Sequence, residues 1–304
     1  MDFGKVELKD LLNIDFSLPA DGVYTKQVLG KVEVKQQCRF NIGGAKWVRP
    51  DWVGVLYPKG TKSNGYLTEY SKQFNSMEMN AMFYGLPSLK TIEGWRAAVS
   101  DDFKFCPKFT KQLTHEKRLK NCVDELDAFL LTLDAFGNNL GSVFLALNPN
   151  MGVKDEKLIV DFIDLLPNEL NLCVELRDGS WFNGNSNHSL FEYLKSRDVG
   201  MVITDTAGRR DCVHMDLTNK HAFIRFVGND LHETDYTRIN DWVSRIGRWL
   251  DAGLEELNFF MHQHDEKNTP VLLTYFIKKL ISNYSLDIKV PRLYNDNGPE
   301  LTLF

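Results

Sequence analysis

The sequence predicts an α/β protein built as a single closed (β/α)8 barrel of the TIM type, with an extension at each end. From residue 38 onward, eight short apolar runs alternate with longer segments of helical period, a pattern typical of parallel βα units. No GxGxxG or GxxxxGK(S/T) motif follows any of these runs, which disfavours an open nucleotide-binding sheet. A chain of 304 residues also has the length of one such barrel.

The apolar runs are the predicted strands, at residues 38–43, 76–80, 103–109, 142–147, 172–177, 199–204, 221–228 and 256–262. The predicted helices lie between them, several with Ser, Asp or Asn near their start, at 64–75, 88–98, 118–137, 154–166, 187–196, 235–252 and 266–282. Only the connection 205–220 lacks a clear helical pattern. We place the barrel domain at 38–282. The extensions 1–37 and 283–304 contain apolar residues that need cover, so we expect them to pack on the barrel exterior or on a partner subunit.

The composition indicates an ordinary globular protein, with 43% apolar and 25% charged residues. A net charge of −5 disfavours nucleic acid as a partner, because binding phosphates needs clustered Lys and Arg. No run of about 18 apolar residues predicts a membrane span, and the charged first residues predict no signal peptide. Five cysteines without a CxxC pair suggest neither disulfides nor a zinc knuckle. We expect a cytoplasmic protein, leave its oligomeric state open and predict no cofactor.

Polar side chains recur near the ends of the predicted strands. Alternation along 172–177 puts three apolar residues on one face and Glu175 and Arg177 on the other. The apolar face suits the helix layer, so Glu175 and Arg177 point toward the barrel axis near the end where active sites of this fold are built. The same argument turns Glu78 and Arg225 inward. A buried, unpartnered carboxylate costs several kcal/mol, so we expect these charges to pair with one another.

A series of motifs carries a resemblance to a known family. In order along the chain they are GGAKW (43–47), PDWVGVLYP (50–58), YSKQFNSMEMNAMFYGLPS (70–88), FKFCPKFTKQLTH (103–115), LGSVFLALNP (140–149), VELRDGSW (174–181) and IRFVG (224–228). From about residue 38 to residue 281 the chain resembles the YecE-like family, domain of unknown function 72. The resemblance implies a TIM-type barrel but no particular reaction.

The resemblance also implies which polar and aromatic residues characterise the site. They fall on Glu78, Asn80, Tyr84, Lys108, Thr114, His115, Glu175, Arg177, Trp181 and Arg225. The chain departs from the family pattern after three strands. It has Ala146 to Pro149 in place of Gln-x-Pro, Val227-Gly228 in place of His-Gly, and His262-Gln263 where the family has Asn. All three departures lie at the predicted rim, so a shared substrate does not follow from the resemblance.

Acid–base or hydrolytic chemistry on a small polar or anionic substrate is the first functional hypothesis. Its predicted catalytic residues are Glu175, Glu78 and His115, and its predicted substrate-binding residues are Lys108, Arg177, Arg225, Asn80, Tyr84, Trp181 and Trp47. Carboxylates and aromatic walls also suit a glycosidase. However, the positions after the fourth and on the seventh strand, where the commonest barrel glycosidases carry their acids, hold Asn148-Pro149 and Arg225.

Two alternatives remain open. A divalent metal site would use His262 and His264, which share one face of the eighth strand, together with Glu78, Glu175 or Asp205. The HQH spacing alone is a weak signal, so these histidines are only weak candidates for metal ligands. The other alternative is a non-catalytic barrel that binds a small molecule with the same cationic residues.

Overall fold

The structure is a computed structural model that describes residues 4–30, 37–183 and 189–294. Its strands are β1 (Arg39–Gly44), β2 (Ser76–Met79), β3 (Lys104–Pro107), β4 (Val143–Ala146), β5 (Leu172–Glu175), β6 (Gly200–Asp205), β7 (His221–Val227) and β8 (Glu256–His262). Its α-helices are α1 (Val23–Val28), α2 (Tyr66–Ser71), α3 (Ala81–Tyr84), α4 (Leu89–Ala97), α5 (Val123–Asp134), α6 (Glu156–Ile163), α7 (Ser189–Ser196), α8 (Glu233–Asp251) and α9 (Thr269–Tyr284). All eight predicted strands are therefore confirmed, and the connection without a clear helical pattern holds the 3-10 segment Ala207–Cys212.

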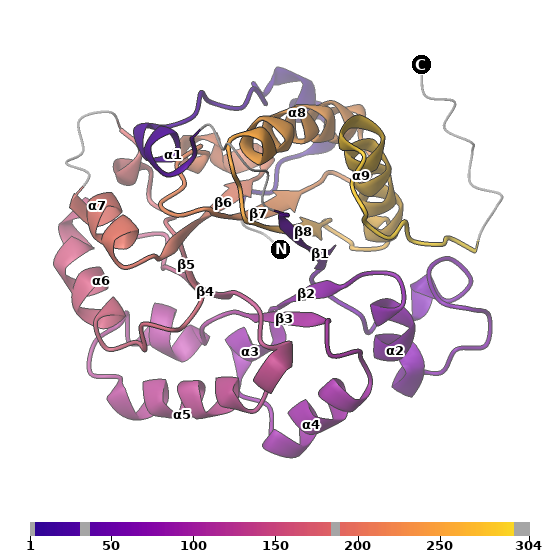
Figure 1. Ribbon diagram of the computed structural model, residues 1–304, viewed down its shortest axis with the longest axis horizontal. Coiled ribbons are helices and arrows are strands. Elements are labelled where there is room, and N and C mark those ends of the chain that lie inside the picture. Colours follow the sequence, from indigo (N-terminus) through magenta and orange to yellow (C-terminus); the bar gives the residue numbers. More distant parts are fainter. Residues whose placement is uncertain (1–3, 31–36, 184–188, 295–304) are drawn as a thin grey trace.

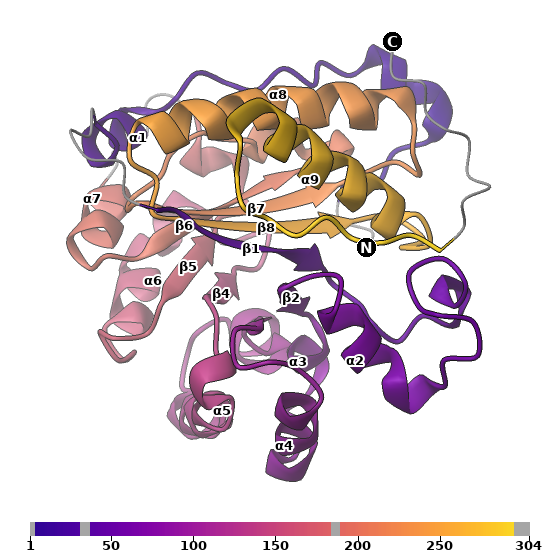
Figure 2. The same cartoon turned by 45° about the vertical axis from the view of Figure 1, so that its right-hand side comes forward.

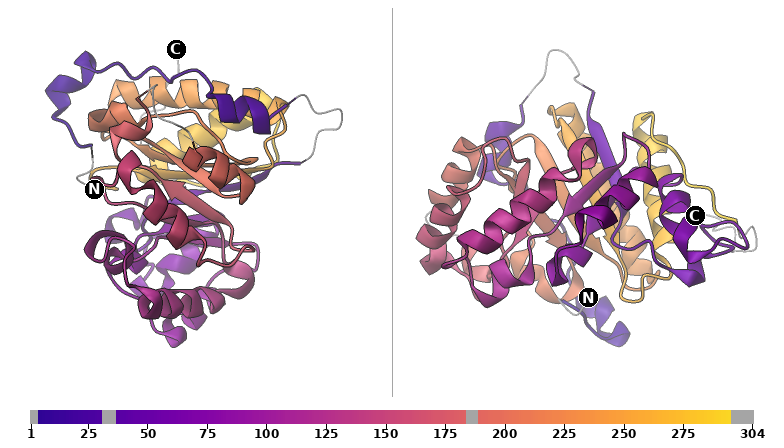
Figure 3. Two further views of the ribbon diagram at one scale, coloured as in Figure 1. Left: turned by 90° about the vertical axis from the view of Figure 1, so that its left-hand side faces the viewer. Right: turned by 90° about the horizontal axis from the view of Figure 1, so that it is seen from below.

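The strands follow one another around a central axis, with the helices outside them (Figure 1). Six form one parallel sheet in the order β1-β8-β7-β6-β5-β4, and β2 pairs with β3 in a second parallel sheet. Helices α8 and α9 cover the outer face of β7, β8 and β1, whereas α4 and α5 lie on the side of β2 and β3 (Figures 2 and 3). The arrangement is TIM-like in the order of its elements.

The prediction of a closed eight-stranded barrel was wrong, because the sheet is open. Between β1 and β2, the described residues form no backbone ladder. Side chains take its place: the Tyr70 hydroxyl accepts from the amide of Gly44 at 2.7 Å and donates to the carbonyl of Ser76 at 3.0 Å. Asn75 accepts from the amide of Ile42 at 2.9 Å. Two inserted side chains thus hold β1 and β2 beside each other without closing the sheet.

The second interruption lies between β3 and β4. These two strands meet only in isolated bridges, Phe105 with Leu140 and Lys108 with Phe144. Strand length does not account for this gap, because β2 with β3 and β4 with β5, all four residues long, form continuous ladders. Alternation of strands and helices in a sequence sets their order, but it does not reveal where the ladder between neighbours is broken.

Substituting Tyr70 by Phe tests the β1/β2 junction. Loss of the buried hydroxyl leaves the Gly44 amide and the Ser76 carbonyl without that partner, so we expect the free energy of unfolding to fall by about 1–3 kcal/mol. Amide hydrogen exchange at Gly44 should accelerate as well. The control is Tyr66→Phe, whose ring lies in the same core. Equal stability of the two variants would contradict the role of the Tyr70 hydroxyl.

The apolar residues form an outer and an inner layer. The outer layer lies between the strands and the helices and contains most of the core. The inner layer is a smaller cluster of strand residues, namely Cys106, Phe144, Ala146, Cys173, Val202, Phe223 and Phe260. Because inward-facing strand residues stack in layers, this cluster forms the floor beneath the charged residues at the carboxyl ends of the strands.

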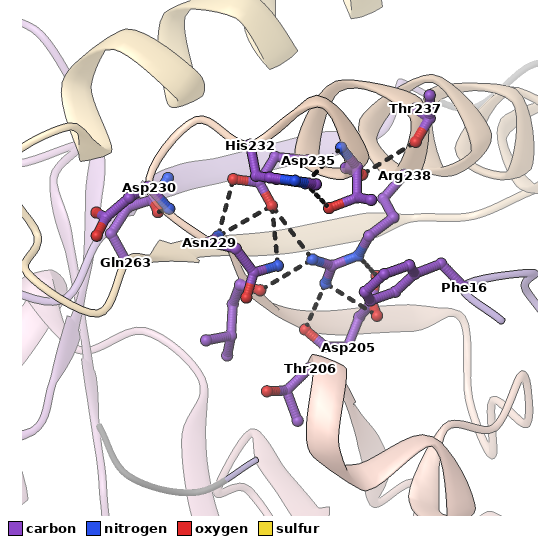
Figure 4. Close-up of polar contacts among 12 residues, drawn as sticks. Phe16, Asp205, Thr206, Asn229, Asp230, His232, Asp235, Thr237, Arg238 and Gln263 are labelled. Atoms are coloured by element: carbon purple, nitrogen blue, oxygen red, sulfur yellow. Dashed lines mark hydrogen bonds and ion pairs between the residues drawn. The ribbon is translucent and has the colours of Figure 1, made fainter. Parts of the chain in front are cut away.

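The N-terminal extension packs on the exterior of α8, beside a group of buried ion pairs (Figures 2 and 4). Arg238 on α8 pairs with Asp205 at 3.0 Å and with Asp235 at 3.4 Å, and its guanidinium lies 4.8 Å from the ring centre of Phe16. Further along the extension, Asp21 pairs with Arg245 at 2.6 Å. The described part of the extension is therefore anchored to the end of β6 and to α8.

The predicted domain boundaries at 37/38 and 282/283 remain predictions. Parts of both extensions, at 1–3, 31–36 and 295–304, lie outside the described residues, as does the predicted helix start at 187–188. Among the described residues, no helix is both long enough and apolar enough to cross a membrane.

Candidate functional site

A fully buried arginine binds two glutamates near the carboxyl ends of the strands. Arg225 on β7 donates from Nε and Nη2 to the two oxygens of Glu78 on β2, at 2.9 and 2.8 Å. Its Nη1 donates to both oxygens of Glu175 at the end of β5, at 3.1 and 3.2 Å. The inner-layer ring of Phe144 lies 5.4 Å below the guanidinium. The expectation that these interior charges pair with one another is confirmed.

Each glutamate has further partners. Glu175 accepts from the hydroxyl of Thr204 on β6 at 2.6 Å and pairs with Arg177 at 3.0 Å. Glu78 accepts from the Asn80 amide at 2.8 Å, and its Oε2 lies 2.9 Å from Nε2 of His262, at the end of β8. Residues from β2, β5, β6, β7 and β8 thus meet in one network, which we call the Arg225 cluster: Glu78, Asn80, Glu175, Arg177, Thr204, Arg225 and His262.

The Arg225 cluster fixes the charge of both glutamates. Burial alone would raise the pKa of Glu175, but the neighbouring cations Arg177, Arg225 and Lys108 lower it to about 2. Burial opposes ionisation of Glu78 in the same way, and Arg225 and His262 hold its pKa well below the usual range. Burial would lower the pKa of His262, yet the carboxylates of Glu78 and Glu266 raise it. Both glutamates are therefore carboxylates at neutral pH.

Lys108, which directly follows β3, has a different environment. Its side chain is 6% exposed, and its ammonium lies 4.2 Å above the ring centre of Phe83 and 5.9 Å from that of Phe144. Within the described residues it forms no ion pair with a carboxylate. Burial and the positive charges of Arg177 and Arg225 lower the pKa of Lys108 to about 7. Lys108 is thus a buried amine that gains and loses its proton near neutral pH.

His115 also packs on Phe83. Its ring meets the Phe83 ring edge to face at 5.1 Å, and its Nδ1 is 2.8 Å from the hydroxyl of Thr114. Burial and the nearby charges of Arg177 and Lys108 lower the pKa of His115 to about 4. His115 is therefore neutral at pH 7 and serves as a hydrogen-bonding group beside the cations.

The three predicted aromatic walls have different surroundings. Trp181 is buried, and its indole donates to the carbonyl of Met151 at 2.9 Å. Trp47 packs edge to face on Trp95 at 5.6 Å. Tyr84 lies at the end of α3 with 82% of its surface exposed. Of these three predicted substrate contacts, Tyr84 alone has a side chain that is mostly open to solvent.

The predicted metal ligands make contacts with other side chains and do not form one group. His262 faces Glu78 with Nε2 and Glu266 with Nδ1, the latter at 3.6 Å, while His264 is half-buried past the end of β8. Among the described residues, no group of three or more His, Cys, Asp or Glu side chains is placed to hold a metal ion. Asp205, the other suggested ligand, is occupied by Arg238 and Arg210.

Three residues of the site were not predicted. Thr204 has a signal in the sequence, because alternation along β6 places it on the same inward face as Val202. Phe83 belongs to the motif at 70–88 but has no polar group to draw attention to it. Glu266 lies in the loop after β8, where no strand periodicity indicates the direction of a side chain.

Fold and site together define a TIM-like α/β protein with an open sheet and a buried network of ion pairs at the carboxyl ends of its strands. The chain belongs to the DUF72 family, which is described as a protein of unknown function and matches residues 41–293. It is 30% identical over 251 residues to the UPF0759 protein YecE of Escherichia coli strain K12, covering 76% of this chain and 89% of the relative. The resemblance seen in the sequence is thereby confirmed.

Solved structures of the family show a similar fold. A DUF72 family protein from Enterococcus faecalis V583 superposes with a TM-score of 0.64 at 18% identity, over 83% of this chain and 98% of that one. A second, from Thermotoga maritima MSB8, gives a TM-score of 0.63 at 19% identity, over 80% of this chain and 99% of that one. At these identities the likeness concerns the fold alone.

Proposed function

We propose that this protein is an enzyme that binds a small polar or anionic molecule beside Lys108 and Arg177, and that Lys108 exchanges a proton with it. The observation that supports this most strongly is the environment of Lys108. A nearly buried ammonium usually has a carboxylate beside it, because an unpaired buried charge is costly. Here the acids nearby, Glu78 and Glu175, are bound to Arg225. A ligand can therefore supply the negatively charged partner of Lys108.

The balance of charge favours an anion. Glu78 and Glu175 supply two negative charges, and they face the three basic side chains of Arg225, Arg177 and Lys108. With Lys108 protonated, the group carries an excess of positive charge in a largely buried setting. A negatively charged or strongly polar ligand would compensate this charge.

Proton transfer follows from the pKa of Lys108. An acid–base group works best when its pKa lies near the working pH, and the pKa of Lys108 is about 7. The pKa values of Glu175, about 2, and of His115, about 4, are far from neutrality. We therefore assign the proton-transfer role to Lys108, and to Glu78 and Glu175 the task of holding Arg225. Binding alone would be served better by a lysine that stays fully charged.

A titration with sulfate tests the proposed site, because sulfate keeps its charge between pH 5 and pH 9. We expect sulfate to shift the amide resonances that follow β3 and β5, and affinity to fall as the pH rises through about 7, where Lys108 loses its proton. Lys108→Met should bind more weakly and lose the pH dependence. The matched control is Lys72→Met, since Lys72 has a side chain that is 56% exposed and forms a surface ion pair with Glu69.

Two results would contradict the proposal. One is a wild-type protein whose resonances do not respond to sulfate at these strand ends. The other is a Lys108→Met variant that binds sulfate as tightly as the Lys72→Met control does.

A further inference from the structure

We propose that a groove next to Lys108 holds an uncharged aromatic or apolar part of the ligand, so that the ligand class is a small anion carrying such a group. This inference rests on the proposed function, because it places the anionic end of the molecule at Lys108. The groove has a volume of about 380 Å³, within the usual range for small-molecule sites. It lies between the end of α3, the segment 110–116 that follows β3, and α5.

The groove and the lysine share one aromatic ring. Phe83 lines the groove, and the ammonium of Lys108 lies 4.2 Å above the centre of the same ring. Thr110, two residues beyond Lys108, also lines the groove. A molecule whose charged end reaches Lys108 therefore extends past Phe83 directly into the groove.

The end of the groove nearest Lys108 exposes two large apolar side chains. Tyr84 lines it and is 82% exposed, packing edge to face on Phe83 at 5.2 Å. Leu86 also lines it and is 38% exposed. A flat ring placed here would contact Tyr84 and Phe83 in the offset or edge-to-face geometry that aromatic groups prefer. It would also remove the exposed apolar surface from water.

The far end of the groove carries charges that already neutralise one another. Lys111 and Glu116 both line it and pair with each other at 3.3 Å. Glu125 also lines it and pairs with Lys117 at 2.6 Å. Since these acids and bases are matched in pairs, the far end offers little attraction to a second charge. The part of the ligand that lies in the groove is therefore uncharged.

A pair of matched probes tests this inference. Methanesulfonate and benzenesulfonate carry the same charged group and stay ionised between pH 5 and pH 9, and only the second has a ring. At pH 6.5 we expect the wild-type protein to bind benzenesulfonate about fivefold or more tightly than methanesulfonate. Tyr84→Ala and Leu86→Ala should each reduce that preference while the affinity for methanesulfonate stays unchanged. The control is Leu89→Ala on α4, a leucine that is 49% exposed and does not line the groove.

The outcomes separate this inference from the proposed function. If Tyr84→Ala keeps the full preference for benzenesulfonate, or weakens both probes equally, the groove assignment is wrong and the site at Lys108 is unaffected. If Lys108→Met binds both probes as tightly as the wild-type protein does, the proposed function is wrong and this inference is lost with it. Loss of methanesulfonate binding in Lys108→Met, together with loss of the ring preference in Tyr84→Ala, would support both.

Discussion

Replacing Arg225 by Met is expected to lower the free energy of unfolding at pH 7 by about 3–5 kcal/mol, measured by urea denaturation. Arg225 is fully buried. It donates two hydrogen bonds to Glu78, and its Nη1 donates to both oxygens of Glu175. Methionine fills much of the same volume but removes one cation from both buried carboxylates, and for Glu78 it is the cation with the largest effect. This loss in the free energy of unfolding reflects buried charges left without compensation, and not the net contribution of the ion pairs to stability.

The pH dependence of the same variant gives a second, independent readout. In the wild-type protein the folded pKa values of Glu78 and Glu175 lie below the ordinary value of 4.5, so their contribution to stability is present above pH 4.5 and is lost as the pH falls further. Without Arg225, the pKa of Glu78 loses its largest lowering influence, so we expect burial to raise it above 4.5. The variant should then become more stable as the pH falls from 7 to 5, so its deficit should shrink.

Arg39→Met is the control for Arg225→Met. Arg39 pairs with Glu256 at 2.9 Å, but its side chain is 64% exposed, so we expect a loss below about 1 kcal/mol. Glu256 also keeps its hydrogen bonds from Ser142 and Asn258. A loss for Arg225→Met as small as that for Arg39→Met, with no change of slope in its pH dependence, would contradict the central role of Arg225.

The sequence predicted the elements of the fold more fully than their assembly. Strong period-2 and period-3.6 patterns placed the eight strands and their order, because burial against the helix layer imposes those periods. Closure of the sheet depends on hydrogen bonds between the backbones of neighbouring strands. These bonds impose no periodicity on the sequence. Tyr70 and Asn75 replace the backbone ladder between β1 and β2 with side-chain hydrogen bonds. Nothing in the local sequence marks these two residues as bridging groups.

The site was predicted in part for a similar reason. Alternation along the strands predicted that Glu78, Glu175 and Arg225 all point toward the central axis. The structure joins them in one network there. The roles of these residues could not be predicted, since they depend on which oxygens accept the hydrogen bonds of Arg225. The burial of Lys108 between Phe83 and Phe144 depends on packing between β3, β4 and α3, which lie far apart in the sequence.

Replacing Lys108 by Met is expected to stabilise the fold at pH 7, by about 2 kcal/mol in urea denaturation. The folded protein holds a base with an ordinary pKa of 10.5 at a pKa of about 7, so the folded environment disfavours the ammonium form. Methionine has a similar length and needs no solvation. It retains contact with Phe83 and Phe144 and removes the repulsion from Arg177.

The stability gained by Lys108→Met should vanish as the pH rises. Between about pH 7 and pH 10.5 the unfolded chain keeps a proton on Lys108 that the folded protein has released, so wild-type stability rises with pH relative to the variant. Lys111→Met, at an exposed lysine, should show neither the gain nor the slope. A Lys108→Met protein that is less stable than wild type at pH 7 would mean that the ammonium is satisfied within the fold. A gain would show that the folded protein keeps a destabilising buried amine, which is the expected cost of a group held ready for proton transfer.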